Sequence, residues 1–144
     1  MIINEKLNPN FVTGFFDGEG CFLIRISQNT TKTGFWVGLT TSVRLNEKNI
    51  NILKDLQDFF GGIGRIYHQE NINEALFTVN SIKEIEIIIS HFDKYPLKTN
   101  KSVDFTLLKQ AYLLIKEKKH STTEGILKLA NIKASMTPPL KRVL

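Results

Sequence analysis

Cysteine is nearly absent from this sequence, because Cys21 is the only one among 144 residues. A single cysteine forms neither an internal disulfide nor a cysteine-based zinc site, and a domain of this length buries enough surface to fold without them. Long apolar runs are also missing, since even residues 85–92 include charged and polar side chains. We therefore expect no membrane-spanning segment. The first ten residues show no basic leader followed by an apolar block, so we expect no secretory signal.

Acidic residues are outnumbered by basic ones, with 14 Asp and Glu against 19 Lys and Arg. The resulting net charge of +5 suits a polyanionic partner, although many basic proteins bind none. Hydrophobic residues make up 42% and charged residues 23% of the chain, which are globular proportions. We expect a single domain over residues 1–144, without a low-complexity tract or an interior linker.

Hydrophobic periodicity and turn residues predict an alternation of helices and strand pairs. The predicted strands cover residues 21–29, 35–45, 64–69 and 74–80. The predicted helices cover residues 9–18, 46–60, 81–91, 101–118 and 121–136. Asn8 is predicted to cap the first helix, and Ser81 with Glu84 to form a capping box for the third. The fold class is therefore α+β, with one four-stranded antiparallel sheet covered by helices on one face.

The other face of this sheet is predicted to be open and polar. Solvated sheet faces are usually rich in Lys and Glu, whereas this one carries Arg, amides, hydroxyls and aromatics, which suit contacts with base edges in a DNA groove. The candidate DNA-binding residues are Arg25, Ser27, Asn29 or its neighbour Gln28, Trp36, Thr40, Ser42, Arg44, Arg65, Tyr67, Gln69, Thr78 and Asn80.

Residues 12–20 read V-T-G-F-F-D-G-E-G and end a predicted helix directly before a strand. This segment resembles the nine-residue signature of the LAGLIDADG homing endonucleases, with aromatics in place of aliphatics at the fourth and fifth positions. Residues 95–101, Y-P-L-K-T-N-K, resemble the family's Pro-Leu…Lys segment at the start of a later helix. The resemblance covers nearly the whole chain and is strongest to the N-terminal half of fungal mitochondrial single-chain members. It implies the αββαββα fold with extra C-terminal helices.

Gly14 and Gly18 lie one helical turn apart, so two such helices can pack with their backbones close together. Thr13 and Asp17 form a second small or polar pair beside them, and all four residues are the predicted dimer interface. By resemblance, family members with one motif act as homodimers, and members with two motifs are about twice as long. A natural homodimer and an isolated half of a two-motif enzyme both remain open.

Glu19 follows this helix directly, at the axis where two motif helices would meet. Two such carboxylates favour a divalent cation, and their hard oxygen atoms suit Mg²⁺, with Mn²⁺ or Ca²⁺ as possible substitutes. The resemblance implies that the backbone carbonyl of Gly18 also binds the metal and that Lys101 acts in catalysis, with Lys98 as the second choice. The family's polar residue near the end of the second strand is matched here by Asn46 or Arg44.

These residues predict a site-specific double-strand DNA endonuclease that acts as a homodimer on a long palindromic site, with metal-dependent phosphodiester hydrolysis. The alternatives are an intron-splicing maturase and a non-cleaving DNA-binding module of the same fold. Glu19 favours the enzyme, because a module that only binds has no use for a carboxylate beside phosphates. A structural or interaction domain is disfavoured by the basic pI and the polar sheet face. Frequent Ile, Asn and Lys indicate an AT-rich gene and point to a mitochondrial origin.

Overall fold

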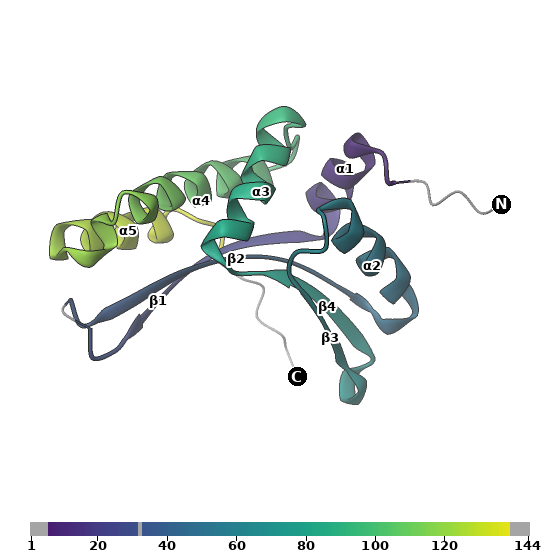
Figure 1. Ribbon diagram of the computed structural model, residues 1–144, viewed down its shortest axis with the longest axis horizontal. Helices are drawn as coiled ribbons and strands as arrows, with labels where there is room; N and C mark the ends of the chain where they lie inside the picture. The colour runs from purple at the N-terminus through teal and green to yellow at the C-terminus, as the bar shows by residue number, and fades with distance from the viewer. Residues whose placement is uncertain (1–5, 32, 139–144) are drawn as a thin grey trace.

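The computed structural model describes residues 6–31 and 33–138 of the chain. Four antiparallel strands form one curved sheet in the order β1-β2-β4-β3 (Figure 1). The strands are β1 (Gly20–Gln28), β2 (Phe35–Asn46), β3 (Arg65–Gln69) and β4 (Glu74–Val79). Each predicted strand is confirmed, with its ends shifted by no more than one residue. The apolar alternation along β2, which only Thr41 interrupts, gave the clearest of these predictions.

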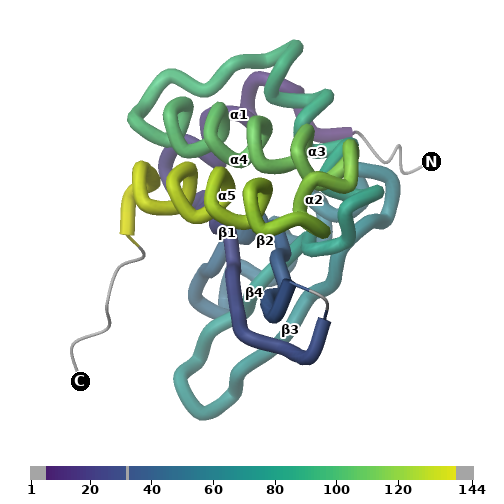
Figure 2. Tube along the Cα trace, turned by 90° about the vertical axis from the view of Figure 1, so that its left-hand side faces the viewer, coloured from purple at the N-terminus to yellow at the C-terminus, as the bar shows by residue number. Residues whose placement is uncertain are grey.

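Among the described residues, five α-helices lie on the same side of the sheet and none covers the opposite face (Figure 1). The helices are α1 (Pro9–Glu19), α2 (Ile50–Phe59), α3 (Ile82–Lys94), α4 (Lys101–Lys116) and α5 (Thr123–Ala134). Short 3₁₀ turns lie in three of the connections: η1 (Glu47–Asn49) between β2 and α2, η2 (Glu70–Ile72) between β3 and β4, and η3 (Lys119–Ser121) between α4 and α5. Figure 2 shows α4 and α5 side by side above β1. None of the described helices is long and apolar enough to cross a membrane.

Aromatic rings join α1 to the sheet and to the helices behind it. The ring of Phe16 on α1 lies 5.2 Å from that of Phe92 on α3, and Phe92 lies 5.8 Å from Phe22 on β1. Phe105 on α4 extends this cluster, with its ring centroid 5.5 Å from that of Phe92. Edge-on aromatic contacts of this kind add to the free energy gained by burial. The helix that carries the signature is therefore seated firmly between the sheet and α3.

The helix ends differ in part from the predicted caps. The side chain of Asn8 accepts a hydrogen bond from the Asn10 amide at 2.8 Å, which confirms this cap. The predicted capping box at Ser81 is wrong, because the Ser81 side chain makes no capping bond. The Glu84 carboxylate instead accepts a hydrogen bond from the backbone amide of Gly64 at 3.1 Å. The Glu84 carboxylate thus binds a donor from the turn before β3 and not the backbone amide at the start of its own helix.

Strand β1 forms one edge of the sheet, and α5 lies against it. The ammonium group of Lys133 on α5 donates a hydrogen bond to the backbone carbonyl of Ile24 at 2.5 Å. This contact joins the last described helix to a strand more than a hundred residues earlier in the chain. It holds α5 against β1, the edge strand that directly follows the signature.

Candidate active site and nucleic-acid interface

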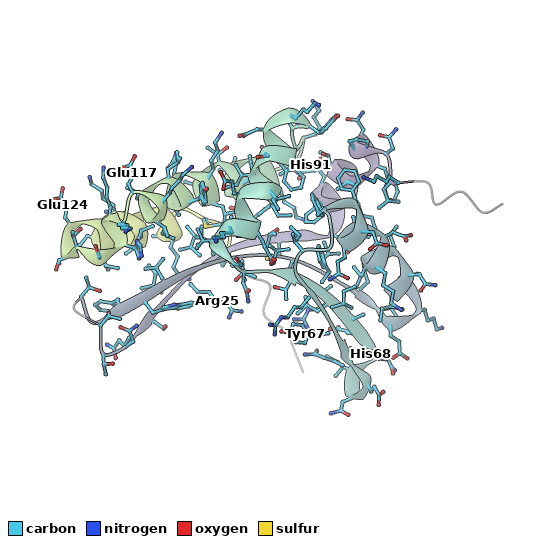
Figure 3. The ribbon with its side chains drawn as sticks, viewed as in Figure 1. Arg25, Tyr67, His68, His91, Glu117 and Glu124 are labelled. Atoms are coloured by element: carbon cyan, nitrogen blue, oxygen red, sulfur yellow. The ribbon has the colours of Figure 1, made fainter. Side chains whose placement is uncertain are left out.

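The open face of the sheet carries the polar side chains that the alternation predicted. Arg25 is paired with Gly38, and Thr78 lies between Ser42 and Arg65, so these residues of all four strands share one face. Figure 3 shows the side chains of Arg25 and Tyr67 on the side of the sheet away from the helices. The side chains on this face that are exposed to solvent are Arg25, Ser27, Trp36, Arg44, Arg65, Tyr67 and Gln69. The structure therefore brings most of the predicted DNA-binding residues onto one surface.

Several of the predicted DNA-binding residues are less available to DNA, and among them Ser42 and Thr78 are only partly exposed. Thr40 lies on the open face but is only 7% exposed. Asn29 stands in the turn after β1, where its carboxamide oxygen accepts hydrogen bonds from the amide and the hydroxyl of Thr31. A guanidinium nitrogen of Arg44 lies 2.9 Å from a carboxylate oxygen of Glu74. Alternation along a strand predicts the face of a side chain but not its partners there.

Trp36 lies flat on the open face across Gly38. A Cβ atom at Gly38 would lie 2.3 Å from the nearest ring atom of Trp36, so the indole occupies the space that glycine leaves free. Almost half of Trp36 is nevertheless exposed, at 48%. Arg25 is the cross-strand partner of Gly38, so its side chain leaves the sheet next to the glycine that the indole covers. The pair offers an apolar and a cationic surface within one part of the face.

Helix α1 presents an open stripe of glycines and phenylalanines. A Cβ atom at Gly14 or at Gly18 would meet no atom within 4 Å. Phe11, one turn before Gly14, is 47% exposed, and its ring centroid lies 5.9 Å from that of Phe15. Apolar and small residues at this spacing form one continuous helix face. This stripe of Phe11, Gly14, Phe15 and Gly18 is a surface on which a second helix can pack closely.

Thr13 and Asp17, the other two predicted interface residues, both make hydrogen bonds within their own chain. The hydroxyl of Thr13 donates a hydrogen bond to the Tyr95 carbonyl at 2.8 Å and lies 3.0 Å from Nε2 of His91. Because the single hydroxyl proton is used on Tyr95, Nε2 of His91 must carry a proton and donate to Thr13. Positions 13 and 17 are rotated by about 100° from the glycines on a helix of 3.6 residues per turn. This rotation turns Thr13 toward α3 and Asp17 toward the loop before α4.

His91 is buried, and its ring lies among aromatic side chains. Figure 3 shows it between α3 and α1. Its imidazole packs against the rings of Phe59, Phe60, Phe92 and Tyr95, with centroid distances of 4.8–5.5 Å. Burial lowers the pKa of His91 to about 4, because the charged form loses its hydration there. A neutral histidine thus helps to hold α1 on α3.

Asp17 binds the loop that precedes α4. Its carboxylate accepts hydrogen bonds from the Lys98 amide at 2.9 Å, the Thr99 amide at 2.9 Å and the Thr99 hydroxyl at 2.8 Å. Burial opposes ionisation of Asp17, but these hydrogen bonds and the charge of Lys101 outweigh it and lower its pKa. The carboxylate is therefore charged, and it connects the end of α1 to the start of α4.

Glu19 is exposed and is the last residue of α1. Carbonyl groups in the last turn of a helix have no intrahelical donor and carry partial negative charge, so the Gly18 carbonyl and the Glu19 carboxylate together favour a cation. Within residues 6–31 and 33–138, no group of three or more His, Cys, Asp or Glu side chains could hold a metal ion. These oxygen donors fit a hard divalent ion, but one chain supplies only part of a coordination shell.

Lys101, the first residue of α4, lies near the junction of α1 and β1. Burial raises the pKa of the Cys21 thiol, the charge of Lys101 lowers it, that of Asp104 raises it, and that of Arg44 lowers it. Lys101 and Arg44 therefore both act on a residue only two positions beyond Glu19. The charges of Lys101 and Arg44 thus both reach the segment that directly follows the signature helix.

Asn46 lies further along β2 from the signature than Arg44 does. Val43 pairs with Gly20 beside the signature, and Asn46 follows three residues later, where it pairs with Glu74. Three residues of strand span about 10 Å. The Asn46 carboxamide oxygen also accepts a hydrogen bond from the Lys48 amide at 3.0 Å and caps η1. Between the two predicted alternatives, Arg44 is thus closer to Glu19 along the strand than Asn46.

Comparison with known proteins places these features in one family. The family model for LAGLIDADG endonucleases matches residues 12–112. The probable intron-encoded endonuclease 3 of Neurospora crassa is 39% identical over 140 residues, which are 96% of this chain and 26% of that protein. The chain thus spans about a quarter of the length of this relative.

Two solved structures show the same fold. The homing endonuclease I-TnaI superposes with a TM-score of 0.88 at 31% identity, and the match covers 93% of this chain and 90% of that one. The meganuclease I-SmaMI, bound to uncleavable DNA, superposes with a TM-score of 0.90 at 38% identity, over 94% of this chain and 46% of that one. By its sequence, its fold and the arrangement of its signature helix, this chain belongs to the LAGLIDADG endonuclease family.

Proposed function

We propose that this chain is a site-specific double-strand DNA endonuclease that hydrolyses phosphodiesters with a divalent metal ion. The observation that carries the proposal is the position of Glu19. Its exposed carboxylate ends the helix with the open glycine stripe and directly precedes β1, whose Arg25 lies on the open sheet face. One residue thus stands where a dimer axis, a metal ion and bound DNA would meet. Family relatives described as endonucleases and a DNA-bound structure support this proposal.

The Glu19 carboxylate and the Gly18 carbonyl are the groups that would hold the metal, and a second copy of α1 would complete the donor set. When bound, Mg²⁺ supplies a Lewis acid that activates water and stabilises charge on the leaving oxygen. Lys101 would stabilise negative charge that develops on the phosphate. Mn²⁺ or Ca²⁺ would occupy the same oxygen donors, and I-SmaMI has been crystallised on uncleaved DNA in the presence of calcium ions.

The assembly that we propose is a homodimer with two-fold symmetry formed through α1. The stripe of Phe11, Gly14, Phe15 and Gly18 is open, and bare glycines allow close approach of a second helix. A two-fold dimer reads two equal half-sites, so the preferred DNA would be palindromic. We propose that residues 1–144 form one domain. The match to I-TnaI supports this, because it covers 90% of that chain. A mitochondrial intron is the proposed origin, as the relative from Neurospora crassa is called intron-encoded.

The test begins with a randomised double-stranded DNA library from which the purified protein selects its own binding sites. The recovered duplexes are then incubated with wild type and with Glu19→Gln in Mg²⁺, with EDTA as a control. We expect the wild type to cut both strands in Mg²⁺ only, and Glu19→Gln to bind the same duplexes without cutting them.

Full cleavage by Glu19→Gln would remove this residue from the mechanism. Selective binding without cleavage by the wild type in Mg²⁺, Mn²⁺ or Ca²⁺ would instead favour the non-cleaving DNA-binding module or the maturase. Sedimentation of the wild type with and without DNA reports the assembly separately. A protein that stays monomeric on its selected DNA would favour an isolated half of a two-motif enzyme.

A further inference from the structure

We propose that Asp17 and Thr99 form a positioning latch, which holds Lys101 in a fixed place relative to Glu19. This inference rests on the proposed endonuclease function, but its residues are neither metal ligands nor predicted contacts with DNA. Asp17 lies two residues before Glu19, and Thr99 lies two residues before Lys101. A bond between Asp17 and Thr99 therefore joins the two reactive segments at matching positions. We expect this bond to fix the distance between Glu19 and Lys101.

The latch is a continuous chain of hydrogen bonds. The backbone amide of Lys101 donates to the hydroxyl oxygen of Thr99 at 3.3 Å, and the Thr99 hydroxyl donates to Asp17 at 2.8 Å. The amides of Lys98 and Thr99 donate to the same carboxylate. Each step fixes one more backbone atom of the segment that leads into α4. These bonds thereby fix the first residue of α4 relative to the last turn of α1.

Helix α4 needs this support because its own cap is weak. Asn100 precedes the helix but makes no side-chain capping bond. Thr99 takes over the task, because its carbonyl accepts a hydrogen bond from the Ser102 amide at 2.9 Å and its hydroxyl accepts one from Lys101. A cation at a helix N-terminus is unfavourable, and the negative charge of Asp17 offsets both the helix dipole and the charge of Lys101. Asp17 thus fixes the position of Lys101 and also reduces the electrostatic cost of a cation there.

Only a carboxylate fits the position of Asp17. Three groups that face it, the Lys98 amide, the Thr99 amide and the Thr99 hydroxyl, donate hydrogen bonds. A carboxylate accepts on both oxygens, whereas an asparagine presents an NH₂ group to at least one of these donors. Asp17→Asn therefore keeps the size of the side chain and breaks the latch. In the same way Thr99→Val keeps the shape and removes the hydroxyl, while Thr99→Ser keeps the hydroxyl.

The experiment compares Asp17→Asn, Thr99→Val and Thr99→Ser with wild type on a duplex selected from the randomised library. Single-turnover cleavage in Mg²⁺ and the dissociation constant for the same duplex in Ca²⁺ are measured separately. We expect Asp17→Asn and Thr99→Val to slow cleavage by roughly 10- to 100-fold, the effect of misplacing a catalytic group by about 1 Å. The dissociation constant should stay unchanged, and Thr99→Ser should cut at the wild-type rate. Thr106→Val is the matched control, since its hydroxyl bonds only within α4, to the Ser102 carbonyl.

A second readout does not need activity. Amide hydrogen exchange of Lys98, Thr99 and Lys101 should accelerate in Asp17→Asn, while amides in the middle of α4 keep their protection. Equal exchange in wild type and Asp17→Asn, or wild-type cleavage by both latch variants, would overturn the proposal. A parallel loss of cleavage, DNA binding and thermal stability would also overturn it, because Asp17 would then serve the fold as a whole. If the wild type itself cuts nothing, the proposed function fails, and the exchange measurement still decides the latch.

Discussion

Arg44 and Glu74 form an ion pair across neighbouring strands on the open face of the sheet, with 2.9 Å between their nitrogen and oxygen atoms. Among the ion pairs within the described residues, none includes Arg25 or Arg65. The guanidinium of Arg44 is thus already shared with a protein acceptor, whereas the other two arginines are not. The three arginines of this face should therefore differ in what they contribute to DNA recognition.

Arg25→Ala should relax the base preference at one symmetric pair of positions in the selected site. An arginine that grips guanine O6 and N7 together discriminates against a wrong base by roughly 1–3 kcal/mol. Arg65→Ala should act in the same way at a different pair of positions, and Arg44→Ala should change overall affinity more than base preference. Selection from the randomised duplex library with each variant measures these profiles. Unchanged profiles for all three variants would show that the open face does not read the sequence.

Gly14→Leu should abolish dimerisation and leave the fold of the single chain intact. A side chain at Gly14 meets no atom of its own chain within 4 Å, so leucine would project only into the proposed interface. Analytical ultracentrifugation should show a monomer, and circular dichroism should match the wild type. Ser90→Leu, which adds the same side chain to an exposed position on α3, is the control and should remain dimeric. A Gly14→Leu variant that still sediments as a dimer would contradict this interface.

The stability of the wild type should fall between pH 6.5 and pH 4, partly because of His91. The pKa of His91 is lowered to about 4 in the folded chain, so the unfolded chain binds a proton first as the pH falls. This contribution is fully present above pH 6.5 and is lost toward pH 4, with a slope of at most about 1.4 kcal/mol per pH unit. Urea unfolding at several pH values should give a shallower slope for His91→Gln than for wild type. Parallel slopes would show that His91 titrates equally in both states.

Gly125→Ala should destabilise the protein by about 1–3 kcal/mol, the usual cost of forcing atoms into a packed site. A Cβ atom at Gly125 would lie 1.7 Å from the carbonyl oxygen of Lys119. Because this oxygen belongs to the backbone, it cannot move aside as the end of a flexible side chain could. The free energy of unfolding in urea measures the effect. Asn131→Ala, an exposed position on the same helix, is the reference and should change little. A Gly125→Ala variant as stable as the wild type would mean that η3 shifts freely against α5.

Local periodicity was sufficient to predict the sheet and its open face, because alternate residues of a strand point to opposite sides wherever the strand lies. The signature likewise predicted the position of Glu19 at the end of α1. The partners of Thr13 and Asp17 could not be predicted in this way. They come from residues 91–99, about eighty positions later, and only the docking of α3 and α4 on α1 brings them together. The failure of the Ser81 capping box has the same cause, since Gly64 belongs to another turn.

The contact between Lys133 and the Ile24 carbonyl has a consequence for how these molecules behave in concentrated solution. β1 is a nine-residue edge strand, and unpaired carbonyl groups on such an edge invite strands from other molecules to pair with them. A lysine that occupies one of these acceptors brings a positive charge to the edge, and each incoming copy would meet the same charge. Aggregation by strand addition is thereby discouraged at β1.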